Sequence, residues 1–476
     1  MNTIDKLPAN LSSTDVKLAR GQFGWTMYEF ARAPSATLIF MFIFAPYFTQ
    51  TVVGNPIEGV KYWGLANTIG GVAIACLAPF VGAIVDRMGR RIPWMIGAFL
   101  VLAIAESLLW FAMPGTNGGL RLGVIIALIA IIAFFVELTT LLHNAMLDSV
   151  GPSSQTGRAS GRGYAMSNTG SLIAILLILS CVILPAQEIG TFAFLPHSPV
   201  FGLDPVYFEH ERIVGPFVAT WLLLFAIPFV VLTPDNPATG LSPANAVKAG
   251  MAQLFNTIRQ ARKVSNVGRF LVGRMLYNDA IIALQVYSAI YGAGVFGWNS
   301  VDILAFAILL AITCAIGSMV AGHLDSRFGS RRIIIVANVA MSICIILMVS
   351  SSPGMILFIP MTEPDPLNAL PLFSSIPEMF FLATFLVLGA VGSMILVCSR
   401  AMLAKISPLK MMTQFFGIYS LSGYATAFLG HALVSSVTGI TGSLQFGMLS
   451  TLILVAAGLA ILFTVKETRA ADLEVD

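Results

Sequence analysis

Charged residues are scarce in this chain. Only 10% of its 476 residues are Asp, Glu, Lys or Arg, whereas 57% are hydrophobic, and the mean hydropathy is +0.86. A soluble domain carries about 25% charged residues, so this composition excludes a water-facing surface and predicts a protein embedded in a lipid bilayer. The net charge of +3 is small. No basic stripe stands out, which excludes nucleic acid as a partner.

Cysteine is also sparse. The five cysteines all fall within apolar runs, and none forms a CxxC pair. We therefore expect neither a disulfide framework nor a metal cluster, and no other cofactor. No nucleophile and base stand together in a recognisable arrangement, so we do not expect an enzyme. The first twenty residues are polar and lack the apolar stretch of a signal peptide.

Long apolar runs, by contrast, fill the sequence. A membrane-spanning helix needs about 20 mostly apolar residues, and twelve segments meet this requirement. They lie at 24–51, 60–85, 92–113, 121–148, 160–184, 213–232, 268–293, 300–324, 332–351, 377–402, 411–437 and 443–465. The prediction is an all-α membrane protein with twelve transmembrane helices in two pseudo-symmetric six-helix bundles. The first bundle is 1–232, a cytoplasmic connector with an amphipathic helix is 233–267, and the second bundle is 268–476.

Two short loops repeat nearly the same motif about 240 residues apart. Residues 82–91 read GAIVDRMGRR, and residues 322–332 read GHLDSRFGSRR. Each loop follows one apolar run and precedes another, which is typical of the duplicated bundles of a secondary transporter. An acid in this loop can accept hydrogen bonds from a helix N-terminus or from an arginine across the bundles, forming a gate. The candidate gating residues are Gly82, Asp86, Arg87, Gly89, Arg90, Asp325, Arg327 and Arg331.

Basic residues are distributed unevenly between the two sides of the predicted helices. Of the 26 lysines and arginines, 21 fall on the side that carries both termini and three fall on the other. Cytoplasmic loops carry an excess of Lys and Arg. Both termini are therefore predicted to be cytoplasmic.

Two charged residues interrupt the first apolar run. Glu29 and Arg32 are three residues apart, so they share a helix face and can pair. Pro34 follows and breaks the helical hydrogen-bond ladder. Because charges inside a membrane are costly and usually functional, this pair is either the wall of a central cavity or a structural ion pair.

The seventh apolar run carries a matching polar group. Arg274, Tyr277, Asn278 and Asp279 lie there, and Tyr277-Asn278 occupies the place of Tyr28-Glu29. Matching helices of two repeats can line one site. Glu137, in the fourth run, could exchange a proton or could be a protonated carboxyl bonded to a neighbouring helix. His143, in the same run, could titrate or could serve only as a hydrogen-bonding residue. The candidates for proton coupling are Glu29, Glu137 and Asp279.

These loops resemble the signature of the major facilitator superfamily between helices 2 and 3 and its second-half copy. Further segments resemble the branch of autophagy-related protein 22, the vacuole-effluxer type. They are Trp25-Thr-Met-Tyr-Glu-Phe-Ala31, Phe44-Ala-Pro-Tyr-Phe48, Asn144-Ala-Met-Leu147, 270–279 and 415–430. The family usually has Asp where Glu29 stands, Lys where Tyr424 stands and Pro where His431 stands. The resemblance adds Tyr424 to the candidate substrate-binding residues, together with Tyr28, Glu29, Arg32, Arg274, Tyr277, Asn278 and Asp279.

The expected function is secondary active transport of a small polar or amphipathic organic solute by alternating access, with protons as a candidate coupling ion. The fungal members of the family are associated with amino-acid efflux, and an amino acid, a short peptide or a carboxylate metabolite suits Arg32 and Arg274. The alternatives are a sugar-like or lipid-like solute, and a membrane sensor or assembly partner without transport. The expected partners are the solute and the lipid bilayer. We expect a monomer in a bacterial inner membrane.

Overall fold

The structure of this chain is a computed structural model. It describes residues 13–115, 119–146, 149–150, 153–187, 196, 198–235, 237, 265–361, 372–407, 415, 419, 423, 426 and 428–467. The side chains of residues 13–19, 78–79, 82–83, 86–88 and 153–160 lie outside the description. The predicted amphipathic helix of the connector and Tyr424 also lie outside the described residues.

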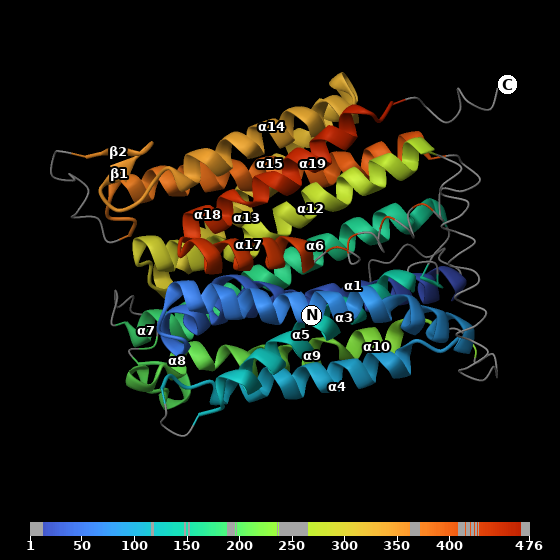
Figure 1. The fold of residues 1–476 in the computed structure, drawn as a ribbon. Coiled ribbons are helices and arrows are strands. Elements are labelled where there is room, and N and C mark those ends of the chain that lie inside the picture. The colour runs from blue at the N-terminus through green and yellow to red at the C-terminus, as the bar shows by residue number, and fades with distance from the viewer. Residues whose placement is uncertain are drawn as a thin grey trace, which may run out of the picture.

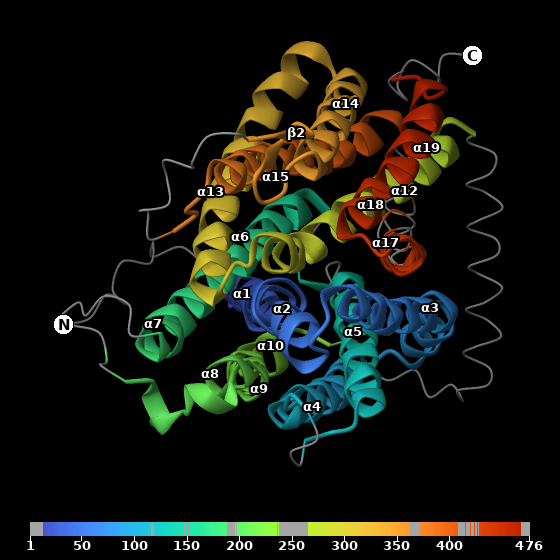
Figure 2. The same cartoon turned by 60° about the vertical axis from the view of Figure 1, so that its left-hand side comes forward.

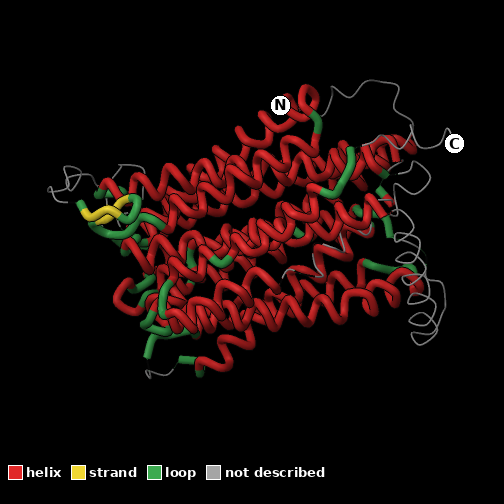
Figure 3. Tube along the Cα trace, turned by 45° about the horizontal axis from the view of Figure 1, so that its top comes forward, coloured by secondary structure: helices red, strands yellow, loops and turns green. Residues whose placement is uncertain are grey.

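The described residues are almost entirely helical (Figure 3). The principal helices of the first half are α1 (Ser13–Pro34), α3 (Pro56–Met88), α4 (Ile92–Leu108), α5 (Leu122–Ala145), α6 (Ser153–Ile178), α9 (Val214–Phe225) and α10 (Ile227–Leu232). Those of the second half are α12 (Ser265–Tyr291), α13 (Ser300–Phe328), α14 (Ser330–Val349), α15 (Ile376–Ile406), α17 (Phe428–Thr441), α18 (Leu444–Leu449) and α19 (Thr451–Phe463).

Short elements extend or connect these helices. Three are α-helical: α2 (Phe44–Tyr47), α7 (Leu184–Ala186) and α8 (Glu209–Arg212). Four are π-helical, namely η1 (Ser35–Phe42), η2 (Phe48–Val52), η5 (Leu179–Ile183) and η8 (Gly292–Phe296), and three are 3₁₀ turns, namely η3 (Leu109–Phe111), η6 (Val200–Gly202) and η7 (Pro205–Tyr207). The strands β1 (Met355–Ile356) and β2 (Ile359–Pro360) pair antiparallel.

Ten helical segments among the described residues are long and apolar enough to cross a membrane. They begin and end within a few residues of ten predicted spans. At the two remaining predicted places the structure has α3, which is 33 residues long, and α17, which is 14 residues long. The all-helical membrane fold is confirmed, whereas the number of twelve spans and the division into six plus six stay predictions.

The predicted spans 160–184 and 213–232 leave residues 185–212 between them, which the sequence predicts to be an external loop, but in the structure the helical part begins earlier, at residue 209. Residues Glu209–Arg212 form helix α8 and open the span Glu209–Leu232. Arg212, counted in the sequence as a loop charge, is fully buried, and its Nη1 donates to the carbonyl of Trp110 at 2.8 Å. The indole ring of Trp110 lies 4.8 Å from the guanidinium. These partners compensate the burial of the charge, and the sequence could not foresee them because they come from a segment about 100 residues away.

Pro34 ends the regular part of the first helix, as its position predicts. Proline has no backbone N–H, so one hydrogen bond of the α-helical ladder is missing at this point. The chain continues as the π-helix η1, and the whole segment Arg20–Val52 forms one interrupted span. The irregular backbone begins directly after the Glu29 and Arg32 pair.

Each half packs chiefly on itself. In the first half α1 packs on α6 and α10, α3 on α5, and α4 on α5 and α9; in the second half α15 packs on α13 and α14, and α12 on α19. Figure 1 shows the first-half helices, blue to green, below the second-half helices, yellow to red. The principal contact between the halves is that of α3 with α17, which lie side by side in Figure 2.

The described chain begins and ends at the same end of the bundle, which we call the termini end (Figure 1). Near its start, Gly21 and Gly24 lie close to Leu232, the last residue of α10, and to Pro234, which follows it. Near its finish, the carbonyl of Lys466 accepts from Asn266 at 2.7 Å. We call the other side the opposite end; it carries β1 and β2 (Figure 3).

The termini end is predicted to face the cytoplasm. A reporter enzyme that is active only outside the cytoplasm, fused after Asp476, should therefore stay inactive in intact cells, and a reporter that is active only inside should work. The same reporters inserted next to Leu357, in the exposed strand turn of the opposite end, should give the reverse pattern. External activity after Asp476 would overturn the orientation derived from the distribution of Lys and Arg.

Candidate functional site

Glu29 and Arg32 pair on one face of α1, as their spacing predicts. The Arg32 Nη2 atom lies 3.1 Å from Glu29 Oε2, and the two side chains keep 19% and 15% of their surface exposed. From α6, Gly163 lies beside the Glu29 side chain, where an added Cβ would be in van der Waals contact with Glu29 Cγ at 3.5 Å. The pair is therefore half-buried inside the protein and retains contact with solvent space.

His143 joins this pair from α5. Its imidazole is fully buried between the rings of Trp25 and Tyr28, each at a centroid distance of 4.1 Å. The Nε2 atom lies 2.9 Å from the Trp25 carbonyl, and the Trp25 indole N–H donates to the His143 carbonyl at 3.1 Å. The Nδ1 atom faces Glu29 Oε1 at 3.5 Å. The sequence predicted a lone histidine near a helix end, and the structure places it against the charged pair.

Tyr28 and Tyr277 occupy matching positions in their halves and make matching contacts. Both are fully buried. The Tyr28 hydroxyl donates to Thr139 Oγ1 at 3.0 Å and so connects α1 with α5. The Tyr277 hydroxyl lies 2.8 Å from Ser399 Oγ and connects α12 with α15. These contacts lie within one half each, and a contact of either tyrosine with a substrate stays a prediction.

The polar residues of α12 lie against the second half's own helices. The Arg274 guanidinium stacks on the Tyr419 ring at 3.7 Å and donates to the Tyr419 carbonyl at 2.9 Å. Asp279 is 1% exposed, and its carboxyl group lies near the Thr426 hydroxyl and close enough to Arg274 to interact with it electrostatically. Asn278 is buried as well. The α12 backbone at Asp279 is within 2.6 Å of a Cβ added to Gly430, so α12 and α17 are in close contact there.

Two further charged residues surround the Glu29 and Arg32 pair. Glu137 of α5 is half-buried and close enough to Arg32 to interact with it electrostatically. Arg400 of α15 acts on Glu29 in the same way, although it belongs to the other half. In the sequence Arg400 stands at the cytoplasmic end of an apolar run, a position that favours contact with the membrane interface or a gate and does not by itself place it beside Glu29.

The two repeated loops each carry a glycine with a positive φ at the end of the preceding helix. Gly89 and Gly329 end α3 and α13 with φ of +85°, a conformation that L side chains rarely adopt. This requirement explains why both loops carry glycine at this place. Of the other first-half gating candidates, Arg90 is exposed, and the side chains of Gly82, Asp86 and Arg87 lie outside the described residues.

In the second half the gating candidates surround a lysine. Lys405 Nζ, from the end of α15, donates to Asp325 Oδ2 at 3.0 Å, to Ser330 Oγ at 2.8 Å and to Glu467 Oε1 at 3.2 Å. The Ser330 hydroxyl also donates to Asp325. Three segments of the second half thus meet at one ammonium group. Arg327 instead lies over the Phe328 ring at 5.3 Å.

Each half caps the start of its third helix with an acid that follows its last helix. Asp235 accepts from the backbone N–H of Arg91 at 2.8 Å and of Ile92 at 3.1 Å. Glu467 accepts from the backbone N–H of Ser330 and Arg331, each at 2.9 Å. An acid at a helix N-terminus satisfies free N–H groups and the helix dipole. The guanidinium of Arg331 additionally donates to the carbonyl of Phe463 at 2.9 Å.

At the opposite end the two halves contact one another directly. The Ser300 hydroxyl, at the start of α13, donates to Glu211 of α8 at 2.6 Å. On α3, a Cβ added to Gly64 would lie 2.2 Å from Ser435 Cβ and 2.8 Å from the Tyr287 hydroxyl. Gly294 likewise approaches Gln50. The structure therefore holds the halves together at this end, through contacts that small residues permit.

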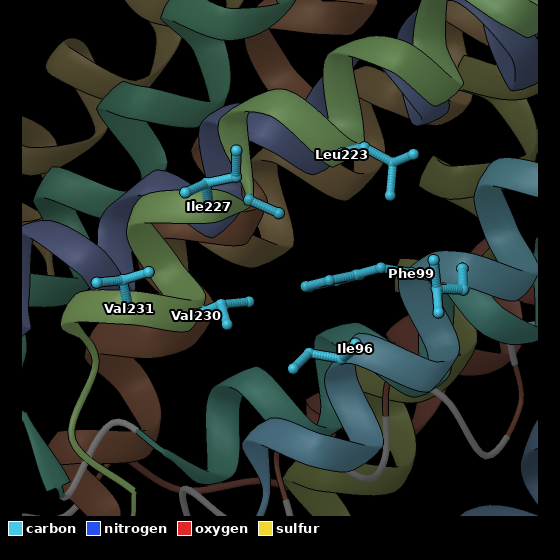
Figure 4. Close-up of a pocket in the computed structure, with 8 residues that line it drawn as sticks. Ile96, Phe99, Leu223, Ile227, Val230 and Val231 are labelled. Atoms are coloured by element: carbon cyan, nitrogen blue, oxygen red, sulfur yellow. The ribbon is translucent and has the colours of Figure 1, made fainter.

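A groove in the first half is apolar, unlike the charged clusters described above (Figure 4). It has a volume of about 220 Å³ and lies between α4 and the pair α9 and α10. Its lining is wholly apolar and contains no predicted site residue; the side chains are Ile96, Phe99, Leu100, Leu223, Ala226, Ile227, Val230 and Val231. Several of these are exposed, Val231 to 71%, which suits contact with lipid. Among the described residues no group of three His, Cys, Asp or Glu side chains could hold a metal ion.

Comparison with solved structures places this chain in the major facilitator fold. A D-xylose–proton symporter superposes with a TM-score of 0.62 at 14% identity, covering 96% of this chain and 99% of the symporter. A bacterial homologue of the human lysosomal transporter Spinster, in an inward-facing and unoccupied conformation, gives a TM-score of 0.61 at 14% identity, covering 96% and 98% of the two chains. Likeness at this identity establishes the fold alone.

Sequence comparison gives the family. The family model described as "Vacuole effluxer Atg22 like" matches residues 51–473. The uncharacterized MFS-type transporter YxiO of Bacillus subtilis (strain 168) is 21% identical over 460 residues, covering 96% of this chain and 97% of the relative. Autophagy-related protein 22 of Cryptococcus neoformans is 21% identical over 316 residues, and the match covers 64% of this chain and 50% of that relative. The chain matches only about half the length of this fungal relative.

The match to the family model extends over most of the chain, and the resemblance noted in the loops and in the first and seventh helices is confirmed. The relatives are transporters and not enzymes, as the sequence indicates. This chain is an integral membrane protein that belongs to the Atg22-like vacuole effluxer family of major facilitator transporters.

Proposed function

We propose that this chain moves a small solute bearing a carboxylate, namely an amino acid, a short peptide or a carboxylate metabolite, by alternating access. The observation that carries the proposal is the placement of Arg32 on α1 and Arg274 on α12, the matching helices of the two halves. Each arginine has an acid close to it in sequence, Glu29 and Asp279. Two arginines and two acids give a nearly neutral site that can bind a zwitterion or exchange an internal carboxylate for that of a solute.

The rest of the predicted site supports the same mechanism. Contacts between the halves gather at the opposite end, whereas Arg32 pairs with Glu29 and Arg274 donates to Tyr419, each a residue of its own half. A rigid rocking of one half against the other would then bring the two clusters toward or away from one another. Glu29, Glu137 and Asp279 are the carboxyls available for coupling to protons. The match to nearly the whole of a bacterial relative favours a bacterial inner membrane, and we expect a monomer.

The test is solute binding by purified protein, measured as thermal stabilisation with zwitterionic amino acids, dicarboxylates and neutral sugars of similar size. The amino acids or the dicarboxylates should stabilise the protein and the sugars should not. Arg274→Gln and Arg32→Gln should each weaken this binding roughly ten- to hundredfold, because a hydrogen bond to a charged group contributes about 1.5–3 kcal/mol.

Arg121→Gln is the matched control. Arg121 is exposed and precedes α5. The control should bind like the unaltered protein. Stabilisation by sugars alone, or unchanged affinity in both arginine variants, would overturn the carboxylate proposal and leave the arginines as structural residues.

A further inference from the structure

His143 and Glu29 face each other with two hydrogen-bond acceptors and no hydrogen between them. The Trp25 carbonyl can only accept a hydrogen bond, so the Nε2 atom of His143, 2.9 Å away, must carry a hydrogen. A neutral imidazole with a hydrogen on Nε2 has a bare lone pair on Nδ1. That lone pair faces Glu29 Oε1 at 3.5 Å, and an ionised carboxylate also only accepts. Two acceptors therefore face each other, and His143 Nδ1 has no hydrogen-bond partner among the described residues.

We propose that Glu29 and His143 together form a proton-binding site, which takes up one proton between His143 Nδ1 and Glu29 Oε1. The proton comes from water and forms a new N–H or O–H bond on one of the two facing atoms. The pair of acceptors then becomes a donor and an acceptor, and the contact becomes a charge-assisted hydrogen bond. Glu29 connects the site to solvent space through its exposed 15%, whereas His143 is fully buried.

The surroundings can stabilise the added positive charge. The faces of Trp25 and Tyr28 stack on both sides of the imidazole at 4.1 Å, and aromatic faces attract a cation. Two further neighbours are apolar: Phe229 of α10 lies 5.9 Å from the imidazole and Phe99 of α4 lies 6.0 Å from Tyr28.

Other charged groups face the site from three helices. Arg32 of α1 and Arg400 of α15 oppose an extra proton, and Glu137 of α5 offsets part of their charge through Arg32. From α6 the neighbour is Gly163, which has no charge. The site is thus balanced between one carboxylate that favours the proton and two arginines that oppose it.

Protonation also changes what Arg32 can bind, and this step rests on the proposed function. Without the proton, Glu29 serves as the ion-pair partner of Arg32 at 3.1 Å. With the proton on the pair, the group formed by Glu29, Arg32 and His143 gains one positive charge, and Glu29 competes less for Arg32. Arg32 is then free to bind the carboxylate of a solute, so uptake of the proton favours binding of the solute. This exchange is the chemistry of proton symport.

The experiment titrates the site without any solute. Protein labelled with ¹⁵N in histidine, in lipid nanodiscs, is followed by NMR between about pH 5 and pH 8, where histidine usually titrates. The chain has five histidines, and His143→Gln assigns the signal. Difference infrared spectroscopy on the same samples reports the carboxylic acid of Glu29, assigned by Glu29→Gln. We expect a single step in which His143 Nδ1 or Glu29 gains a proton, with Nε2 protonated throughout.

The proposal requires that the titration of His143 depend on Glu29 and that the titration of Glu29 depend on His143. Glu29→Gln should remove the step at His143, because an amide N–H can donate to Nδ1 at every pH. His143→Gln should remove it at Glu29. His431→Gln is the matched control: His431 is likewise buried in a membrane helix, and its closest ring partner is Tyr287 rather than an acid. This control should leave the step unchanged.

Three results would overturn the proposal. They are the absence of any titration step, a step that persists when the partner residue is replaced, and a hydrogen on Nδ1 with none on Nε2. Glu29→Asp provides a second variant if Glu29→Gln fails to fold; its shorter side chain should move the step away from its position in the unaltered protein. Because no solute is present, failure of the carboxylate assignment in the binding test leaves this result unaffected.

Discussion

Gly64→Leu should open the opposite end of the bundle. In the structure a Cβ at this position would lie 2.2 Å from Ser435 Cβ, so the observed contact of α3 with α17 has no room for a side chain. Overpacking costs about 1–3 kcal/mol, which shifts a two-state equilibrium roughly five- to hundredfold. Because the contact lies between the halves, the substitution should shift the equilibrium between conformations rather than unfold either half.

The measurement is the distance between spin labels at Val206 and Ile440, in a background without the five native cysteines. Both residues are exposed at the opposite end, Val206 in the first half and Ile440 at the end of α17. The distance should lengthen in Gly64→Leu. Gly97→Leu is the control, since a Cβ at Gly97 meets no atom within 4 Å. An unchanged distance distribution in Gly64→Leu would show that this contact does not hold the opposite end closed.

Lys405→Met should destabilise the second half strongly. The ammonium neutralises Asp325 and Glu467 at once, and its removal leaves two carboxylates close together without a counter-charge. Breaking a buried ion pair costs about 3–5 kcal/mol. Lys405 is 30% exposed, so solvent screening reduces the expected loss to about 1–3 kcal/mol. The apparent melting temperature in detergent should fall accordingly.

A rescue variant distinguishes loss of charge balance from loss of packing. Adding Asp325→Asn and Glu467→Gln to Lys405→Met removes the unpaired charges and should recover most of the lost stability. Lys61→Met is the control, because Lys61 pairs with Glu58 on an exposed surface, with side chains 50% and 43% exposed. Such pairs contribute about 0–1 kcal/mol. If Lys405→Met resembles Lys61→Met, or the triple variant is no more stable than the single one, the network has no such role.

Local features of the site could be predicted from the sequence because their causes are local. The spacing of Glu29 and Arg32 places both on one helix face, and the structure pairs them at 3.1 Å. Pro34 lacks an N–H and interrupts the first span where the sequence places it. Gly89 and Gly329 occupy equivalent places in the repeated motif, and both have a φ of +85°, although their ψ angles differ.

Contacts between distant segments could not be predicted in this way. His143 is more than 110 residues from Glu29 and meets it only because α1 packs against α5. In the sequence Lys405 is one of several positive charges near the end of a predicted span, yet in the structure it joins Asp325 to Glu467. Glu211 was placed in an external loop, whereas it contacts Ser300 of the other half.

The sequence by itself determined the solvent and the secondary structure of this protein. A chain with few charges and long apolar runs must lie in a bilayer, and backbone groups in lipid must find their hydrogen bonds within helices. Its repeated loops and the segments in its first and seventh helices resemble the family to which the family model assigns the chain. Only the tertiary structure decided which charges meet, because an ion pair or a shared proton depends on distances of about 3 Å between helices, which spacing along the chain does not specify.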